Sequence, residues 1–155
     1  MTTSILFVCL GNICRSPSAE GVARKMAPDL VPDSAGTGGW HAGEAPYAPM
    51  QAAALARGYD LSDLWARQFR RADFTKFSLI LAMDRSNLAD IEAQRPEGNA
   101  TPLRLFTDYL GPESAHFGTL DVPDPWYMRD FDATLDLIEA CTRALLADLG
   151  QSARD

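Results

Sequence analysis

The first 26 residues place a strand, a tight turn and a helix in immediate succession, and this unit limits the possible folds more than any other part of the chain. Residues 4–9 (SILFVC) form a β-branched and aromatic run, which is typical of a strand. Residues 16–26 then offer a cap (Ser16), an early proline (Pro17) and a first-turn acid (Glu20) for a helix. A strand that leads directly into a helix predicts the start of an α/β fold.

The rest of the chain continues this alternation. Further strands are predicted at residues 30–35, 77–83 and 103–106, and further helices at 46–57, from Asp84 or Ser86 onward, and from Asp130 or Asp132 to Gly150. Residues 110–127 form a long loop rich in Gly, Pro and Asp, and loops of this length are often functional. With no linker or internal repeat, the pattern predicts a single α/β domain over residues 1–155. Its parallel sheet would carry helices on both faces and bind ligands at the carboxyl ends of the strands.

Charge and cysteine content narrow the range of possible functions. With 14 Lys and Arg against 21 Asp and Glu, the net charge is −7 and no basic run could follow a nucleic-acid backbone. No apolar run reaches the roughly 20 residues of a membrane span, and the N-terminus lacks the basic region of a signal peptide, so we expect a cytoplasmic protein without nucleic-acid or membrane partners. Three cysteines favour free thiols, and Cys141, on the apolar face of the last helix, is expected in the core. Two distant histidines make a metal site unexpected.

The turn between the first strand and the first helix has the composition of an anion site. Its sequence is CLGNICRS, residues 9–16, in which Cys9 and Arg15 lie six positions apart. Such a loop can bind phosphate with the N–H groups of Leu10, Gly11, Asn12, Ile13, Cys14 and Arg15, and the Arg15 guanidinium can bind two oxygens. The same positive surroundings favour a thiolate at Cys9, which would then be a nucleophile. Gly11 and Asn12 suit the left-handed backbone of a tight loop.

A cysteine and an arginine at this spacing also occur by chance. The alternative is a small buried Cys9 at the end of a core strand, beside an ordinary helix cap. The adjacent Ser16, the preceding strand and the following helix favour the anion site.

Five segments resemble the low-molecular-weight protein tyrosine phosphatases, in the order and spacing of that family and over nearly the whole chain. They are CLGNICRS at 9–16, Ser34 with GTGGWH at 36–41, Ala66-Arg67-Gln68, Met83-Asp84 with Asn87, and Asp124-Pro125-Trp126-Tyr127. The resemblance implies a four-stranded parallel sheet flanked by helices, with the phosphate-binding loop between the first strand and the first helix. It also implies a phosphotyrosine-containing protein as substrate and inorganic phosphate as product, without cofactor or metal.

The resemblance assigns the reacting groups residue by residue. Cys9 is the nucleophile, Arg15 stabilises the transition state, and Ser16 donates a hydrogen bond to the sulfur. Asp124 is the general acid and then the general base; considered alone it is an ordinary turn former. Cys14 resembles a residue that captures the oxidised nucleophile as a disulfide.

Other residues are expected around this centre. Asp121 is the local rival of Asp124, but it lacks the following proline and aromatic pair. Trp40, Trp126 and Tyr127 resemble the aromatic walls of the substrate cleft, although tryptophan is more often a packing residue.

Asn12, Ser34 and Asp84 resemble residues that support the loop. Leu64 stands where the family commonly has a histidine bonded to the loop asparagine, so we expect Asn12 to lose one support. Arg67 is interpreted as a solvated charge at a helix end.

Neighbouring activities use the same scaffold. Thiol-coupled arsenate reductases add a cysteine pair after the third strand, and residues 78–100 contain no cysteine. Protein arginine phosphatases usually have threonine where this chain has Ile13. A silent phosphoprotein-binding module would not need Cys9, Arg15, Ser16 and Asp124 together. Phosphotyrosine hydrolysis is therefore the favoured function, and the sequence does not determine the oligomeric state.

Overall fold

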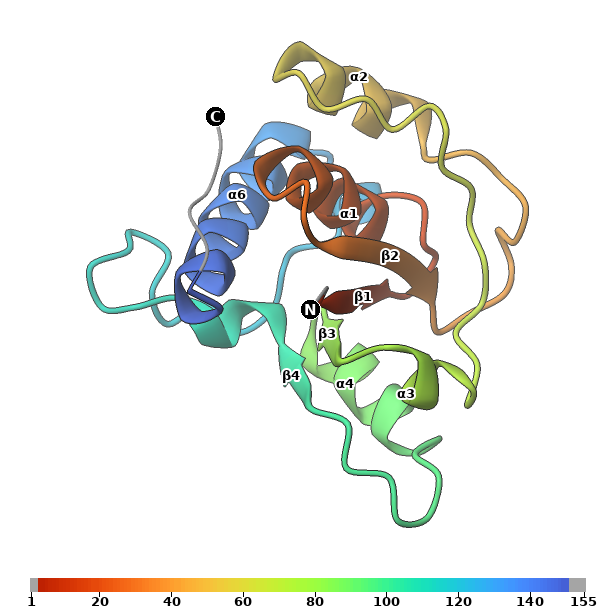
Figure 1. The fold of residues 1–155 in the computed structure, drawn as a ribbon. Coiled ribbons are helices and arrows are strands. Elements are labelled where there is room, and N and C mark those ends of the chain that lie inside the picture. Colours follow the sequence, from red (N-terminus) through yellow and green to blue (C-terminus); the bar gives the residue numbers. More distant parts are fainter. Residues whose placement is uncertain (1–2, 151–155) are drawn as a thin grey trace.

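The computed structural model describes residues 3–150; residues 1, 2 and 151–155 lie outside that part. Its centre is one four-stranded sheet in which each neighbouring pair is parallel, in the order β2-β1-β3-β4 (Figure 1). The strands are β1 (Ser4–Cys9), β2 (Val31–Gly36), β3 (Leu79–Ala82) and β4 (Leu103–Leu105). The four predicted strands and the α/β fold class are confirmed.

The position of β1 in the middle of the sheet determines where a ligand can bind. Strand β1 pairs with β2 from Ser4–Val31 to Cys9–Gly36, and with β3 on its other side. The chain passes from β1 to β2 on one side of the sheet and later to β3 on the other. The carboxyl end of β1 is therefore a topological switch point, where open α/β sheets form their binding crevices.

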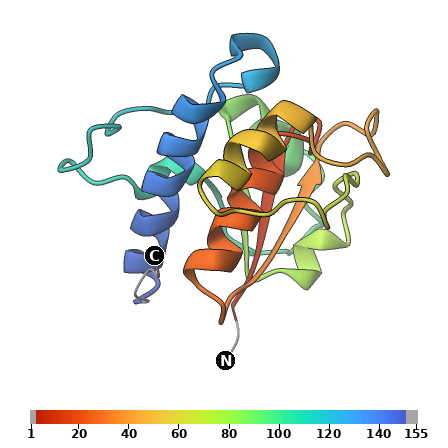
Figure 2. The ribbon, with the colours of Figure 1, turned by 90° about the horizontal axis from the view of Figure 1, so that it is seen from above.

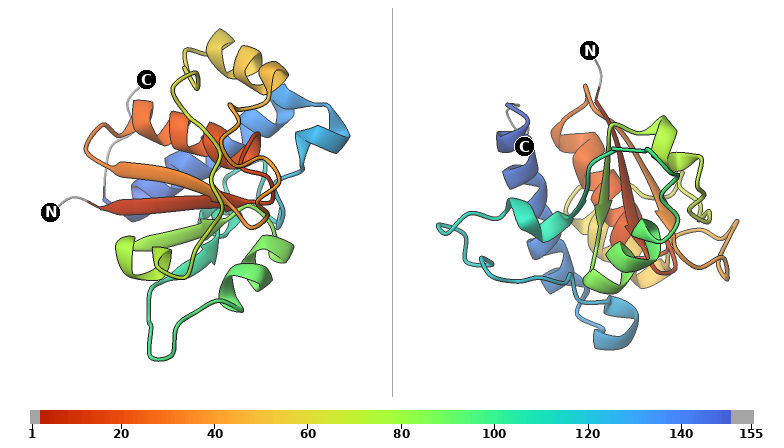
Figure 3. Two further views of the ribbon diagram at one scale, coloured as in Figure 1. Left: turned by 90° about the vertical axis from the view of Figure 1, so that its right-hand side faces the viewer. Right: turned by 90° about the horizontal axis from the view of Figure 1, so that it is seen from below.

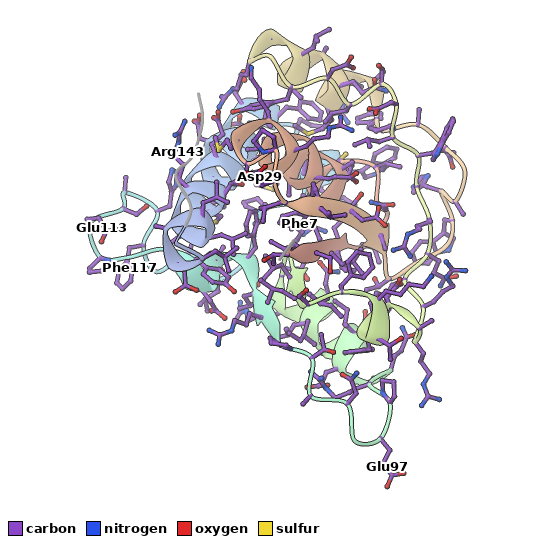
Figure 4. All side chains as sticks on the ribbon, viewed as in Figure 1. Phe7, Asp29, Glu97, Glu113, Phe117 and Arg143 are labelled. Atoms are coloured by element: carbon purple, nitrogen blue, oxygen red, sulfur yellow. The ribbon has the colours of Figure 1, made fainter. Side chains whose placement is uncertain are left out.

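Helices cover both faces of the sheet, as predicted (Figures 1 and 2). One face carries α1 (Arg15–Met26), α2 (Ala48–Ala56) and α6 (Phe131–Asp148), and the other carries α3 (Asp73–Lys76) and α4 (Arg85–Glu92). Successive side chains of β1 point to opposite faces of the sheet, so this strand contributes to the hydrophobic core on each face. Phe7 points toward α1 and α6, and Leu6 points toward α3 and α4. Phe7 lies at the centre of the molecule, whereas Glu97, Glu113 and Phe117 lie on projecting loops (Figure 4).

The helix starts predicted from the sequence match the structure where a side chain caps the helix. Asp84 accepts the N–H of Asn87 at the start of α4, and Asp130 accepts that of Ala133 at the start of α6. The last helix buries Cys141 fully, as expected.

Three short elements were not predicted: α3, the 3₁₀-helix η1 (Phe106–Tyr109) and α5 (Pro125–Met128). Each spans four residues, too few for a hydrophobic period to be visible. Helix α5 interrupts the loop predicted at 110–127. It lies with the segment after β2 at the carboxyl end of the strands (Figure 3).

No helix in the described part of the chain is both long and apolar enough to cross a membrane.

Candidate active site

The loop after β1 turns through one left-handed residue. Asn12 has φ 57°, whereas Gly11 is not among the residues with positive φ, so the expectation of left-handed backbone at both positions is wrong for Gly11. A Cβ at Gly11 would lie 3.1 Å from Cδ2 of His41. Glycine at this position therefore allows close approach of the neighbouring loop.

The start of α1 is open to an anion. The helix begins at Arg15, the N-cap position is Cys14, and no side chain caps the first turn. The predicted cap, Ser16, instead lies inside the helix, so that prediction is wrong. Uncapped N–H groups at a helix N-terminus carry the positive end of the helix dipole and bind phosphate oxygens readily.

Two donors converge on the sulfur of Cys9 at the base of the loop. The backbone N–H of Asn12 lies 3.2 Å from it and the Ser16 hydroxyl 3.0 Å. The Ser16 oxygen accepts a 2.8 Å hydrogen bond from Nδ2 of Asn12, which leaves its own hydrogen for an acceptor. The sulfur is closer than the alternative acceptor, the carbonyl of Ala35 at 3.4 Å. Both donors favour a negatively charged sulfur.

A hydrogen bond from Arg67 stabilises the turn at Asn12. The Arg67 backbone N–H donates to Oδ1 of Asn12 at 2.9 Å, so the side-chain oxygen has a partner although Leu64 replaces the expected histidine. The Arg67 guanidinium pairs with Asp73 at 3.0 Å and with Asp33 at 3.3 Å. Asp73 is 1% exposed. Arg67 is therefore a partly buried ion-pair residue and not the solvated charge that we expected.

Arg15 joins three parts of the chain. Its Nη1 donates to Asp84 after β3 at 2.7 Å and to the carbonyl of Val122 at 3.0 Å, while Nη2 lies 3.6 Å from Asp124. Burial alone would lower the pKa of Arg15, but Cys9 and the two carboxylates raise it overall. The guanidinium is thus a fixed positive charge beside the Cys9 sulfur. The Val122 carbonyl is a backbone group, so no sequence pattern could identify it.

The environments of the two candidate acids differ. Asp121 accepts hydrogen bonds from the Arg85 side chain and backbone, the shortest at 2.9 Å, and these hold its pKa below the usual range. A carboxyl group held in its charged form is a poor proton donor. Asp124 lines the cavity above the phosphate-binding loop, and its Oδ1 accepts a hydrogen bond from the N–H of Trp126. The geometry therefore favours Asp124.

A cavity of about 260 Å³ opens above the loop. It is lined by Cys9, Leu10, Gly11, Ile13, Cys14, Arg15, Trp40, His41, Asp124, Trp126 and Tyr127. All three predicted wall residues are among them. Asn12 is not, because its amide points away from the cavity toward Ser16 and Arg67. His41 was missed by the sequence analysis, and its only signal was its position beside Trp40.

Ser34, which was expected to support the loop, and Cys14, which was expected to capture the oxidised nucleophile, have the following surroundings. The Ser34 hydroxyl donates to Glu20 at 2.7 Å, and no hydrogen bond described for Ser34 reaches residues 9–16. Cys14 is a buried free thiol, and burial, together with Cys9, raises its pKa to about 12.

The contact between Glu20 and Ser34 predicts a pH-dependent stability. Glu20 is 8% exposed, and burial raises its pKa to about 7. The folded state therefore favours the neutral carboxyl of Glu20. Its contribution to the free energy of unfolding is fully present below the pKa of the unfolded chain and is lost as the pH rises through about 7. Between pH 5 and 8, we expect wild type to lose about 2 kcal/mol of unfolding free energy relative to Glu20→Gln.

Urea unfolding at several pH values measures this difference, and Glu97→Gln on a projecting loop is the control. Glutamine keeps an acceptor for Ser34 but cannot ionise. Equal pH slopes for wild type and Glu20→Gln would contradict the prediction.

The fold and the site together define a class of protein: an α/β domain with a cysteine at the base of an anion-binding loop, an arginine beside it and a carboxyl group opposite. No group of three or more His, Cys, Asp or Glu side chains that could hold a metal ion occurs within residues 3–150.

Comparison with known proteins agrees with this class. Residues 4–155 match the low molecular weight phosphotyrosine protein phosphatases. The low molecular weight protein-tyrosine-phosphatase of Streptomyces coelicolor is 43% identical over 95% of this chain and 93% of its own, and the human low molecular weight phosphotyrosine protein phosphatase is 37% identical over 94% of each. The crystal structure of YfkJ from Bacillus subtilis superposes with a TM-score of 0.89 at 35% identity, covering 97% of this chain and 96% of that one. The chain belongs to the low molecular weight phosphotyrosine protein phosphatase family.

Proposed function

We propose that the protein hydrolyses phosphotyrosine in proteins through a phosphocysteine intermediate on Cys9. The observation that carries this proposal is the convergence of Cys9, Arg15 and Asp124 on one cavity whose rim is aromatic. Trp40, Trp126 and Tyr127 supply flat apolar surfaces that suit a phenyl ring. The loop below them supplies donors for the phosphate oxygens.

In the first step, the sulfur of Cys9 attacks phosphorus and the bond from phosphorus to the tyrosine oxygen breaks. The N–H groups of residues 10–15 and the Arg15 guanidinium bind the equatorial oxygens and stabilise their charge in the transition state. Asp124 gives its proton to the departing oxygen, which leaves as the neutral phenol.

In the second step, the ionised Asp124 removes a proton from water, and the resulting oxygen attacks phosphorus. The phosphorus–sulfur bond breaks and inorganic phosphate is released. The N–H of Asn12 and the hydroxyl of Ser16 donate to the sulfur as it regains its negative charge. This cycle uses no cofactor.

Release of phosphate from a phosphotyrosine peptide tests the proposal. Phosphoarginine and arsenate with a thiol are the competing substrates, because arginine phosphatases and arsenate reductases resemble this scaffold. Ile13 lines the cavity and offers no hydroxyl to a phosphoguanidine. We expect turnover of the phosphotyrosine peptide at least about tenfold faster than that of phosphoarginine. The reverse order would contradict the assignment.

Replacement Asp124→Ala should lower kcat/KM, which reports the step in which the leaving group departs, about 100-fold for phosphotyrosine but much less for para-nitrophenyl phosphate. The reason is that nitrophenolate leaves without protonation, whereas the tyrosine oxygen is a poor leaving group. Steady-state rates on both substrates measure the difference. Asp121→Ala is the matched comparison, and a larger loss from that variant would mean that Asp121 is the acid.

We also propose that residues 1–155 act as one domain in the cytoplasm. All three cysteines are free thiols, and a reducing compartment keeps a reactive cysteine in that state.

A further inference from the structure

The segment that carries Asp124 runs from Val122 to Asp130. Hydrogen bonds hold both of its ends, and the part between them lies outside the sheet. At its start, the Val122 N–H donates to the Met83 carbonyl at 2.8 Å, and the Val122 carbonyl accepts from Arg15. At its end, Asp130 caps α6. The four-residue helix α5 lies between these points and holds the side chains that face the cavity.

Helix α5 ends at a residue whose backbone conformation favours glycine. Arg129 has φ 61° and ψ 9°, in the left-handed region, and its N–H donates to the Pro125 carbonyl. Its side chain makes a specific contact: Nη1 donates to the hydroxyl of Tyr47 at 2.8 Å. The guanidinium also lies over the rings of Tyr47 and Phe131, at 5.2 and 5.3 Å from their centroids.

Tyr47 connects this contact to the phosphate-binding loop. Its backbone N–H donates to the carbonyl of Ile13 at 2.8 Å. Its ring packs against the ring of Trp126, with centroids 4.7 Å apart and planes inclined by 53°. Tyr47 therefore contacts the phosphate-binding loop through its backbone, α5 through its ring, and the residue that ends α5 through its hydroxyl.

We propose that Tyr47 and Arg129 are positioning residues that hold Asp124 and Trp126 over the phosphate-binding loop. Trp126 and Asp124 move together because Oδ1 of Asp124 accepts the Trp126 N–H at 3.0 Å. A displacement of α5 by about 1 Å would thus take the acid out of reach of the departing oxygen, because proton transfer requires hydrogen-bond distance. The inference rests on the proposed function, in which Asp124 is the acid.

Variants of Tyr47 and Arg129 test their contact when rates are compared on a phosphate ester with a poor leaving group and on one with a good leaving group. Arg129→Met removes the donor, and Tyr47→Phe removes the acceptor but keeps the ring against Trp126. We expect each to lower kcat/KM, which reports the step in which the leaving group departs, about tenfold for phenyl phosphate and less than about twofold for para-nitrophenyl phosphate. Arg129→Lys, which can still donate to Tyr47, should recover most of the loss. The double variant should be no worse than Arg129→Met, since that single variant already breaks the hydrogen bond that Tyr47→Phe removes.

The matched control is Arg71→Met at an exposed arginine just before α3, and it should leave both rates unchanged. Equal losses on the two substrates would show a general structural effect and overturn the inference, as would the absence of any loss. Inhibition by inorganic phosphate should be the same in wild type and variants, because the phosphate-binding loop is intact.

A second measurement separates this inference from the proposed function. Trp126 is the only tryptophan left in a Trp40→Phe, Trp65→Phe background. Adding Arg129→Met there should shift its emission to longer wavelength as the ring loses its packing. If wild type hydrolyses neither phosphate ester, the proposed function fails, but this shift still supports the positioning contact; an unchanged spectrum overturns it.

Discussion

Replacement Cys9→Ser is expected to abolish hydrolysis, by at least about 10⁴-fold, while phosphate binding is retained. Cys9 is 2% exposed at the base of the loop and lines the cavity, where it is the nucleophile of the proposed mechanism. A serine hydroxyl there is un-ionised at neutral pH and has no adjacent base. The N–H groups and Arg15, which we propose bind the phosphate oxygens, are unchanged, so the product should still bind.

Two measurements check this result: steady-state turnover of a phosphotyrosine peptide and calorimetric titration with phosphate or vanadate. Cys141→Ala is the matched control. It removes a thiol from the core on α6, away from the cavity, and should lower stability without abolishing turnover. Hydrolysis by Cys9→Ser at near the wild-type rate would refute the phosphocysteine mechanism.

The second large effect is expected for Arg15→Lys, which should lower kcat/KM by at least about 100-fold. Arg15 donates to Asp84 and to the Val122 carbonyl from one side of its guanidinium. The remaining N–H groups can bind two phosphate oxygens in one plane. A lysine ammonium is a point charge and cannot make both sets of contacts at once.

Arg24→Lys is the control for this substitution. Arg24 lies on the same helix but pairs with Asp63 on the surface at 3.0 Å, so we expect its rate within about twofold of wild type. A loss below about tenfold for Arg15→Lys, or 1.4 kcal/mol, would show that this residue does not stabilise the transition state.

The sequence predicted the parts of the molecule that depend on neighbouring residues. The alternating patterns located all four strands, and Asp84 and Asp130 marked two helix starts through their caps. Cys9 and Arg15 lie in one short loop, so their juxtaposition follows from their spacing. The choice of Asp124 over Asp121 depended on the family resemblance.

Only the tertiary structure showed which distant groups hold that loop. Arg15 meets the Val122 carbonyl across 107 positions of the chain, and Arg129 meets Tyr47 across 82. The Arg67 N–H supports Asn12, and Ser34 bonds to Glu20 and not to the loop. Backbone groups are the same in every residue, and a contact between distant segments leaves no period in the sequence. Such contacts are decided when the sheet brings the carboxyl ends of its strands together.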